Sequence, residues 1–467
     1  AYGINIQRSS SIVENCIIIN CSEQGIDDEC APDTCNSVYR NNIIISNSAS
    51  SGVVFNFGGY PTFMNNILIE EGNTWTGVSV GTVRGAVIKN NLISGYLVEN
   101  IHIGDIRTDT AKIINNVSRD VPPSPWGNGP GILTMTGHRT QIKNNIIANT
   151  FTGLDGYHSN DSTTGDYNLF WNVTNLTAGN ASLGDSNIVA DPMFVKDTIP
   201  NPQLDYDFHL QKYSAAIDKG DPSILDVDGS RSDIGMFGGP GGQRYTYMDL
   251  APKPPSNLTA SMDSGFVKLK WNKNTEADFF RYRVYRDTVP NFMYDTTKII
   301  VVISDTIFYD DPPQKYISGN YYYKITALDN AQHQSAASEE VHINITGIPE
   351  APPIVVEHYR LLNNYPNPFN PSTTIPYRLK EGGYVKVMVY NILGERVRVL
   401  VNKYQNAGYY EVVFNPDASE RKNAEGFVEF ETGYGDIVSG IYLYRIEVIG
   451  EGNIPVFTDM KKMMLVK

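Results

Sequence analysis

The sequence predicts an all-β protein in which a solenoid of short stacked strands is followed by two smaller β-sandwich domains. Three observations carry this prediction. The 467 residues include 40 glycines, 26 prolines and 29 tyrosines, a composition typical of turn-rich β proteins. Asparagine pairs followed by aliphatic residues recur about every 25 residues through the first third of the chain. Two proline-rich linkers, 252–255 and 349–353, then separate two regions with the alternating pattern of exposed and buried strand residues.

The repeat has two marks in each period. An asparagine pair, or a close variant of one, begins the repeats at Asn15, Asn41, Asn65, Asn90, Asn115, Asn144 and Tyr167. About eight to eleven residues later a glycine precedes an aliphatic residue, at Gly25, Gly52, Gly77, Gly131 and Gly153. No segment has the periodicity of an amphipathic helix. Parallel strands stacked about 4.8 Å apart would align equivalent residues of successive coils, so that aliphatic side chains form a core and asparagines form a ladder.

This pattern resembles the right-handed parallel β-helix proteins, the group that contains pectate-lyase-like and other polysaccharide-active enzymes. The series 166–170, 190–194, 216–222 and 226–235 is similar to the closing segment of many secreted bacterial β-helices. The resemblance predicts a right-handed parallel β-helix over residues 1–245. We expect further coils upstream of Ala1, because residues 3–6 already have the pattern of the middle of a repeat.

The two regions after the β-helix each resemble a known module. Alternating strands with Trp271 and a late run of tyrosines over residues 253–347 resemble a fibronectin type III domain. Residues 359–467 resemble the Ig-like type A sorting domain of the type IX secretion system. The motif residues are Tyr365, Pro366, Asn367, Pro368, Phe369, Asn370, Gly394, Gly440 and Tyr442. An extra polar segment at 417–435 departs from the usual pattern. The second resemblance implies export through the type IX machinery and a secreted or cell-surface, outer-membrane-associated location.

Four cysteines, Cys16, Cys21, Cys30 and Cys35, lie within 20 residues. In a secreted protein, an even and clustered number of cysteines favours two local disulfides with three possible pairings. A zinc site and free thiols in the core are the alternatives. The spacing lacks the close Cys-x2-Cys pairs of common zinc sites, so disulfides are the preferred interpretation.

Candidate functional residues follow from aligning the coils on the glycine mark. One outward column then contains Asp27, Val54, Ser79, His102, Leu133 and Asp155. The catalytic candidates are His102, Arg107 and His138, as bases. The candidates for contacting substrate are Asp27, Asn56, Asp105, Asp155 and His158. Asp105 and Asp155 could also bind calcium, and Asp226, Asp228 and Asp233 form either a calcium site or a structural cap.

The composition also limits the possible partners. The net charge of −14 makes nucleic acid an unfavourable partner, and the sequence has no apolar run long enough for a transmembrane helix. The expected partner is a polysaccharide or surface glycan. The sequence leaves open whether the β-helix only binds the glycan or cleaves it as a polysaccharide lyase or glycoside hydrolase. The alternative function is a non-catalytic adhesin or a filament-forming structural protein, with the β-helix as a rigid, self-associating rod.

Overall fold

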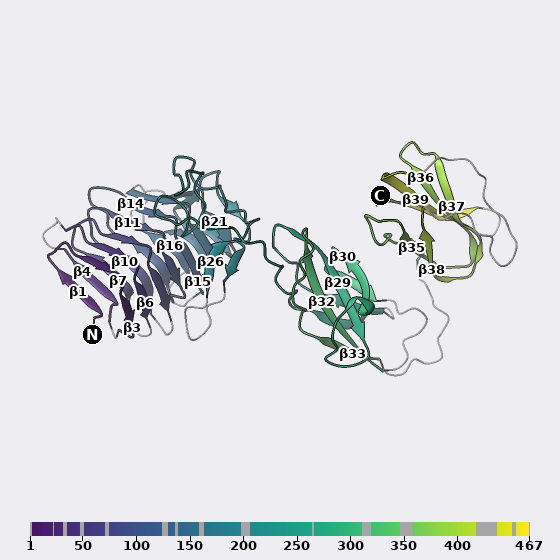
Figure 1. Ribbon diagram of the computed structural model, residues 1–467, viewed down its shortest axis with the longest axis horizontal. Helices are drawn as coiled ribbons and strands as arrows, with labels where there is room; N and C mark the ends of the chain where they lie inside the picture. The colour runs from purple at the N-terminus through teal and green to yellow at the C-terminus, as the bar shows by residue number, and fades with distance from the viewer. Residues whose placement is uncertain are drawn as a thin grey trace. The chain divides into compact units, whose positions relative to one another are not determined.

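The computed structural model contains a parallel β-solenoid followed by antiparallel sheets, which confirms the predicted fold class (Figure 1). The structure describes residues 2–21, 23–30, 35–46, 51–70, 74–123, 129–135, 139–157, 163–197, 206–263, 266–310, 319–345, 358–416, 437–450 and 454–466. The chain divides into two compact units, residues 1–252 with 275–279 and residues 253–274 with 280–467. The predicted boundaries of three domains remain a prediction.

Three eight-stranded parallel sheets, here called A, B and C, form the solenoid, and each coil contributes a strand to them in turn. Sheet A contains β1 (Ile4–Gln7), β4 (Ile26–Glu29), β7 (Ser51–Asn56), β10 (Thr76–Val80), β13 (Glu99–Ile103), β16 (Pro130–Thr134), β19 (Thr152–Gly156) and β22 (Asn175–Gly179). Sheet B contains β2 (Ile12–Glu14), β5 (Val38–Arg40), β8 (Thr62–Met64), β11 (Ala86–Lys89), β14 (Ala111–Ile114), β17 (Thr140–Lys143), β20 (Thr163–Asp166) and β23 (Ala181–Leu183). Sheet C contains β3 (Ile17–Ile19), β6 (Ile43–Ser46), β9 (Ile67–Glu70), β12 (Leu92–Ser94), β15 (Val117–Val121), β18 (Ile146–Thr150), β21 (Leu169–Trp171) and β24 (Ile188–Val189).

The second asparagine of each pair forms the predicted ladder between sheets B and C. Asn91 is fully buried, and its Nδ2 donates to Oδ1 of Asn116 at 2.9 Å and to the carbonyl of Phe63 at 3.0 Å. Its Oδ1 accepts from the backbone and side-chain nitrogens of Asn66. The same pattern links Asn42, Asn66, Asn91, Asn116, Asn145, Asn168 and Asn187. Each buried amide is thereby satisfied, so the ladder fixes the register of the coils.

The first asparagine of each pair has a different role. Asn41, Asn65, Asn90, Asn115 and Asn144 all have φ between 55° and 58°, a left-handed conformation that asparagine tolerates better than most residues. This conformation makes the sharp bend from sheet B to sheet C.

A closing segment, described over residues 190–197 and 206–250, covers the outer side of the later strands of sheet C. Phe194, Phe208, Leu210, Ala216 and Ile234 pack there in one buried cluster with Leu92, Val117, Ile146 and Leu169. The left-handed asparagines also bind this segment. Asn115 Nδ2 donates to the Asp233 carbonyl at 2.8 Å, and Asn144 Oδ1 accepts from the Asp221 amide at 2.7 Å. The segment includes β25 (Phe194–Lys196) and β26 (Asp207–Leu210).

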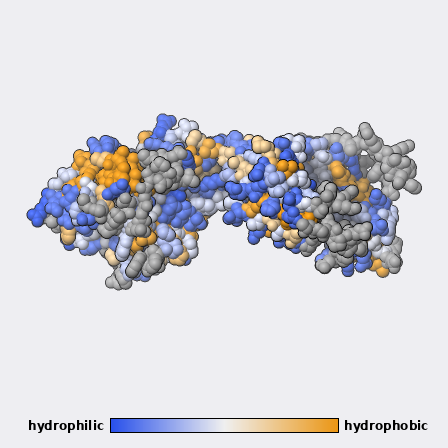
Figure 2. Space-filling model, turned by 90° about the horizontal axis from the view of Figure 1, so that it is seen from below, coloured by the Kyte–Doolittle hydropathy of each residue, from blue (hydrophilic) through white to orange (hydrophobic). Residues whose placement is uncertain are grey.

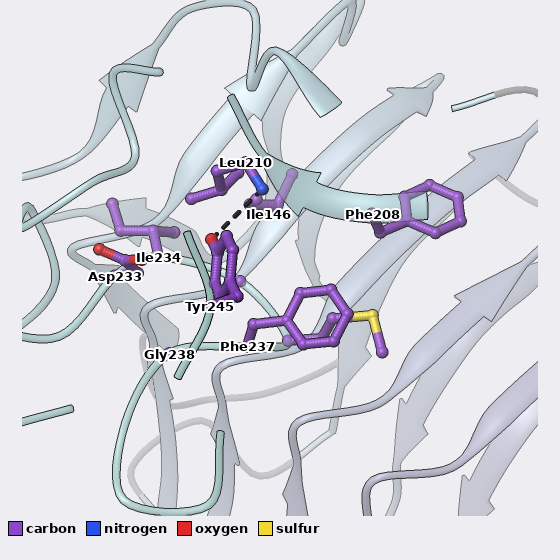
Figure 3. A pocket seen from close by; sticks show the side chains of 10 residues that line it. Ile146, Phe208, Leu210, Asp233, Ile234, Phe237, Gly238 and Tyr245 are labelled. Carbon is purple, nitrogen blue, oxygen red and sulfur yellow. Dashed lines mark hydrogen bonds between the residues drawn. The ribbon is translucent and has the colours of Figure 1, made fainter. Parts of the chain in front are cut away.

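Figure 3 shows the seam between the closing segment and sheet C. Ile146 of sheet C faces Leu210, Ile234 and Phe237, and the Tyr245 hydroxyl accepts from the Leu210 amide at 3.3 Å. The Asp233 carboxylate lies at the same seam and accepts from the Tyr247 hydroxyl at 2.9 Å and from the Asp218 amide at 2.9 Å. The space between these groups is filled, so we interpret the seam as a packing interface and not as a binding pocket.

We expect Asp233 to make the closing segment less stable as the pH rises. Burial, with a smaller contribution from Asp226 and Asp218, raises the pKa of Asp233 to about 6, whereas the unfolded chain has a value of about 3.9. The folded state therefore favours the protonated form, and stability contributed by this group is lost between pH 4 and 6, by about 3 kcal/mol. Hydrogen exchange of closing-segment peptides across this range should show the loss in the wild-type protein and a weaker pH dependence in Asp233→Asn. Equal pH profiles for both proteins would contradict the assignment.

The closing segment leaves the first strands of sheet C uncovered. Ile17 and Ile19 of β3 are 65% and 51% exposed. Ile17 is in register with Ile43 and Ile67, which are half-buried, and this column continues into the covered Leu92. Figure 2 shows a hydrophobic patch near this end of the β-helix. The apolar outer face of sheet C is therefore only partly covered by its own chain.

One of the two predicted disulfides is present. Cys30 is bonded to Cys35, whereas Cys16 and Cys21 are free thiols. The prediction of a second disulfide is therefore wrong. The three residues of β3 between Cys16 and Cys21 alone span about 10 Å, which exceeds the roughly 7 Å limit between the Cα atoms of a disulfide. Cys16 instead occupies the ladder position of its coil, where its amide donates to Asn42 Oδ1 at 3.0 Å.

The strands between residues 259 and 345 form two antiparallel sheets of three and four strands, as expected for a fibronectin type III-like sandwich. Trp271 is buried and packs edge to face against Tyr282, with ring centroids 5.3 Å apart. The smaller sheet contains β27 (Thr259–Asp263), β28 (Phe266–Lys270) and β31 (Ile307–Asp310). The larger sheet contains β29 (Phe279–Asp287), β30 (Ile299–Ile303), β32 (Gly319–Asp329) and β33 (Val341–Ile345), with a short 3-10 helix η2 (Thr296–Lys298) before β30.

The strands between residues 360 and 465 again form sheets of three and four strands around one apolar cluster. The smaller sheet contains β34 (Arg360–Leu361), β35 (Thr373–Leu379) and β38 (Gly408–Phe414). The larger sheet contains β36 (Gly383–Asn391), β37 (Arg396–Gln405), β39 (Gly440–Ile449) and β40 (Pro455–Leu465). The polar segment 417–435 lies outside the described residues.

The proline-rich motif at residues 365–370 forms hydrogen bonds with the end of β40, the last strand of this region. Phe369 is buried, its amide donates to the Met464 carbonyl at 2.9 Å, and its carbonyl accepts from the Val466 amide at 3.0 Å. Asn367 Oδ1 accepts from the Met464 amide at 2.9 Å. We call this set of contacts between residues 367–369 and the end of β40 the C-terminal clasp. It lies at the motif but does not by itself identify a sorting domain.

The other motif residues occupy turns and strand ends. Tyr365 donates from its hydroxyl to Glu411 at 2.7 Å, and the Pro366 carbonyl accepts from the Thr373 hydroxyl at 2.8 Å. Gly394 has a φ of 82° in the turn between β36 and β37, where a side chain would be strained. Gly440 begins β39, and the Tyr442 hydroxyl donates to the Val438 carbonyl at 2.8 Å. Pro368 and Asn370 are exposed beside Phe369.

Candidate functional site

The outward column predicted on sheet A is present in the structure. Strand register pairs Asp27 with Val54, Val54 with Ser79, Ser79 with His102, His102 with Leu133, and Leu133 with Asp155. Aligning the coils on their glycines gives the correct register because the close approach of the next coil requires glycine at this position. A Cβ on Gly77 would lie 2.5 Å from the Asn100 carbonyl oxygen of the next coil and 2.7 Å from Ile93, so a larger residue does not fit there. The glycines therefore mark equivalent positions of successive coils.

The column does not bring its two carboxylates together. Asp27 and Asp155 are five rungs apart, roughly 24 Å at the strand spacing of a parallel sheet. A glycoside hydrolase requires two carboxylates separated by roughly 5 to 9.5 Å. These two residues cannot act as such a pair.

Asp27 is more buried than expected for a residue that was predicted to contact substrate. It is 6% exposed and accepts from Asn5 Nδ2 at 2.9 Å on the neighbouring strand. Burial raises the pKa of Asp27, and the nearby Glu29 and Asp28 carboxylates add to this effect. Asp28 lies in register with Ile6 and Phe55 of the core, and burial raises its pKa as well. This acidic sequence therefore belongs to a strand and not to a solvated loop.

His102 is the partly exposed titratable group at the middle of the column. Its Nδ1 lies 3.2 Å from Oε1 of Glu99, which also accepts from the Thr76 hydroxyl at 2.6 Å. The Glu99 side chain is 7% exposed, and that of His102 is 26% exposed. Glu99 thus orients the imidazole. Glu99 was not recognised from the sequence, because residues three apart on a strand normally point to opposite faces of the sheet.

Asp105 and Arg107 follow β13 and are both exposed. Their closest charged atoms are 3.8 Å apart, a solvent-exposed pair with little energetic value. The Arg107 carbonyl accepts from the Arg139 guanidinium. The structure therefore places both residues beyond the end of the strand that carries His102 but does not direct them at it. His138 and His158 lie outside the described residues, so their proposed roles remain predictions.

A second column lies beside the first, two residues further along the chain in each coil. It contains Glu29, Asn56, Gly81, Gly104, Met135 and Tyr157. Gly81 and Gly104 follow the strands of Ser79 and His102; Gly81 is half-buried and Gly104 is buried. Tyr157 is 46% exposed and Met135 is 39% exposed, and they supply apolar surface at one end of this column. Asn56 lies at the other end, with its Oδ1 over Gly81.

We call the surface of Ser79, His102, Gly81 and Tyr157 the sheet-A face. It offers a hydroxyl, an imidazole with a buried carboxylate partner and an aromatic ring. Such a mixture suits the hydroxyl groups and apolar ring faces of a sugar chain. The exposed Tyr157 was not recognised from the sequence, because only polar residues were considered beyond the first column.

The residues considered for calcium in the closing segment do not fit that role. The Asp226 carboxylate accepts from the backbone amides of Asp233 and Gly239. Asp228 accepts from the amide and hydroxyl of Ser230. Carboxylate oxygens that satisfy backbone donors stabilise turns, so these residues fit the alternative prediction of a structural cap.

Comparison with known proteins does not assign a family. No family model matches the chain, and no curated protein matches it. Among solved structures, a fibronectin-type-III-like protein from Clostridium thermocellum is 25% identical over 21% of this chain and 99% of its own, with a TM-score of 0.18. Dimeric latent PorU from Porphyromonas gingivalis is 15% identical over 46% of this chain and 20% of its own, with a TM-score of 0.20. An alpha-L-rhamnosidase from Dictyoglumus thermophilum is 12% identical over 45% of this chain and 30% of its own, with a TM-score of 0.18. In the part of the chain that the structure describes, no helix has the length and hydropathy needed to cross a membrane.

Proposed function

We propose that this chain is a secreted bacterial surface protein that binds a polysaccharide on the sheet-A face of its β-helix. The observation that carries the proposal is the register of the partly exposed Ser79 and His102 on adjacent strands, with the exposed Tyr157 two strands further along sheet A. A sugar chain lying across these strands would reach the Ser79 hydroxyl and the His102 imidazole. The apolar face of one of its rings would contact Tyr157.

The proposed role is binding, because the described carboxylates of the column do not form a hydrolytic pair. His102 remains the candidate base for a lyase reaction, in which it would remove a proton from a uronate residue while Glu99 holds the ring in position. Glu99 acts in this scheme as a positioning residue. Products with a new carbon–carbon double bond would absorb ultraviolet light, so an absorbance assay with the same polysaccharides can detect a lyase.

His102→Ala is expected to weaken polysaccharide binding about tenfold, since one charge-assisted or neutral hydrogen bond is worth roughly 1 to 2 kcal/mol. The test uses the full chain and a panel of neutral and uronate-containing polysaccharides, with affinity measured by calorimetry. His358→Ala is the matched control, because His358 is an exposed histidine outside the β-helix. Equal affinities of His102→Ala and wild type would refute the proposed contact, and failure of every polysaccharide to bind would refute the function.

We also propose that residues 359–467 direct export through the type IX secretion system. The support is the motif at residues 365–370 together with its contacts to the end of β40 in the C-terminal clasp. In a bacterium that has this system, wild-type protein should reach the cell surface or medium, and a chain truncated before residue 359 should remain in the periplasm. Export of the truncated chain would contradict the proposal.

The exposed isoleucines of sheet C favour a second candidate function, self-association of the β-helix. Ile17 and Ile19 continue an apolar face that is covered by the closing segment further along. A second copy of the chain would cover them in the same way. Light scattering coupled to size exclusion should then show multimers in the wild type and monomers in the double variant Ile17→Asp, Ile19→Asp. Monomeric wild-type protein at high concentration would exclude this function.

A further inference from the structure

A groove of about 210 Å³ opens at the turn that leads from sheet C to sheet A. It involves strands β15 and β18 and the residues after β21. Its lining includes the side chains of Pro122, Pro123, Asn149, Thr150, Phe151 and Asn172. Among the described residues, none that lines the groove carries a charge. The groove therefore suits an uncharged ligand of about the size of one ring, below the roughly 300 Å³ of a drug-sized site.

The side-chain amides of Asn149 and Asn172 in the groove are fixed in one orientation by a chain of hydrogen bonds. Arg119 Nε donates to Asp120 Oδ2 at 2.6 Å, and Asp120 Oδ1 accepts from Asn149 Nδ2 at 2.9 Å. Asn149 Oδ1 then accepts from Asn172 Nδ2 at 2.9 Å. The direction of this chain leaves Oδ1 and the second N–H of Asn172 available at its exposed end. The partly buried charge pair polarises the chain and strengthens its terminal groups.

The rest of the groove supplies apolar surface and one unsatisfied hydroxyl. Phe151 is half-buried, and Pro122 and Pro123 are exposed. Thr150 is 3% exposed, and its Oγ1 has no hydrogen-bond partner among the residues that the structure describes. An unpaired buried hydroxyl is costly, so it marks a place where a further polar partner would be favourable.

We propose that this groove binds a single neutral sugar ring. A ligand hydroxyl donates to Asn172 Oδ1 and its neighbour accepts from Asn172 Nδ2, while the C–H face of the ring lies against Phe151 and the prolines. A rearrangement of the Thr150 side chain lets a third hydroxyl pair with Oγ1. The site is distinct from the sheet-A face, since none of its lining residues belongs to that face, and it extends the proposed function by a second contact point for a glycan.

The test uses ligands too short to need the sheet-A face. Methyl glycosides of neutral hexoses are the probes, methyl galacturonoside is the anionic comparison, and saturation-transfer NMR on the full chain detects binding. The key variant is Asn172→Gly, because Asn172 has a φ of 50° that glycine adopts without strain. Asn41→Gly is the matched control, since Asn41 is an exposed asparagine with a φ of 58° outside the groove.

The proposal predicts saturation transfer to at least one neutral glycoside in the wild type, His102→Ala and Asn41→Gly, and at least a tenfold loss of affinity in Asn172→Gly. Unchanged binding by Asn172→Gly, binding of the anionic glycoside alone, or no binding by the wild type would overturn it. These outcomes are separable from the proposed function. Polysaccharide binding that depends on His102 without glycoside binding would remove only the groove. Glycoside binding without any polysaccharide binding would remove only the sheet-A face.

Discussion

Replacing Asn116 by alanine is expected to destabilise the β-helix by about 4 kcal/mol, because it removes a fully buried rung of the asparagine ladder. Asn116 Oδ1 accepts from the backbone and side-chain nitrogens of Asn91. Its Nδ2 donates to Asn145 Oδ1 at 3.0 Å and to the Ile88 carbonyl at 2.9 Å. Alanine leaves several buried groups without partners, each at a cost of about 1 to 3 kcal/mol.

The measurement is chemical denaturation followed by hydrogen exchange of peptides from residues 86–121, which reports on these coils without a contribution from the second unit. Asn41→Gly serves as the control, since Asn41 belongs to the left-handed position of its pair and its change should stay within about 0.5 kcal/mol. A cost for Asn116→Ala no larger than that of the control would show that the ladder does not hold the coils in register.

Phe369→Ala should destabilise the C-terminal domain by about 3 to 5 kcal/mol, as large-to-small changes of buried aromatic residues do. Phe369 is 2% exposed and packs edge to face against Phe414, with centroids 5.8 Å apart. Its backbone amide and carbonyl also form hydrogen bonds with Met464 and Val466 at the end of β40. The loss of its ring should therefore open the C-terminal clasp before the rest of the domain unfolds.

Hydrogen exchange of peptides covering residues 455–466 measures this opening. Leu393→Ala is the matched control, because Leu393 is an apolar residue of the same domain that is 78% exposed in a turn. If the amides of Met464 and Val466 remain as protected in Phe369→Ala as in Leu393→Ala, the clasp does not depend on this side chain. If the clasp also serves export, Phe369→Ala should lower the amount of protein at the cell surface.

The solenoid could be predicted because its rules are local and repeated. The left-handed first asparagine and the buried second asparagine require specific residue types at every turn, and a Cβ at Gly77 or Gly153 would clash with the next coil. Because these requirements recur in each coil, the sequence has a regular period. The register of Ser79 and His102 follows from that period.

Contacts between distant segments could not be predicted in the same way. The closing segment covers sheet C through contacts such as Asn115 with Asp233, which are 118 residues apart and follow no period. The failure of Cys16 and Cys21 to pair depends on the strand that lies between them. The enclosed Asp27 and the pairing of Glu99 with His102 depend on side-chain positions across neighbouring strands, which the alignment of a single column does not contain.

The most direct test of the sheet-A face is hydrogen exchange of the full chain with and without the best-binding polysaccharide of the panel. Binding at this face should slow exchange in peptides that contain residues 76–81 and 99–104, and His102→Ala should abolish the protection at equal polysaccharide concentration. Protection confined to other surfaces, or none with any polysaccharide, would contradict the assignment of this face as the binding surface.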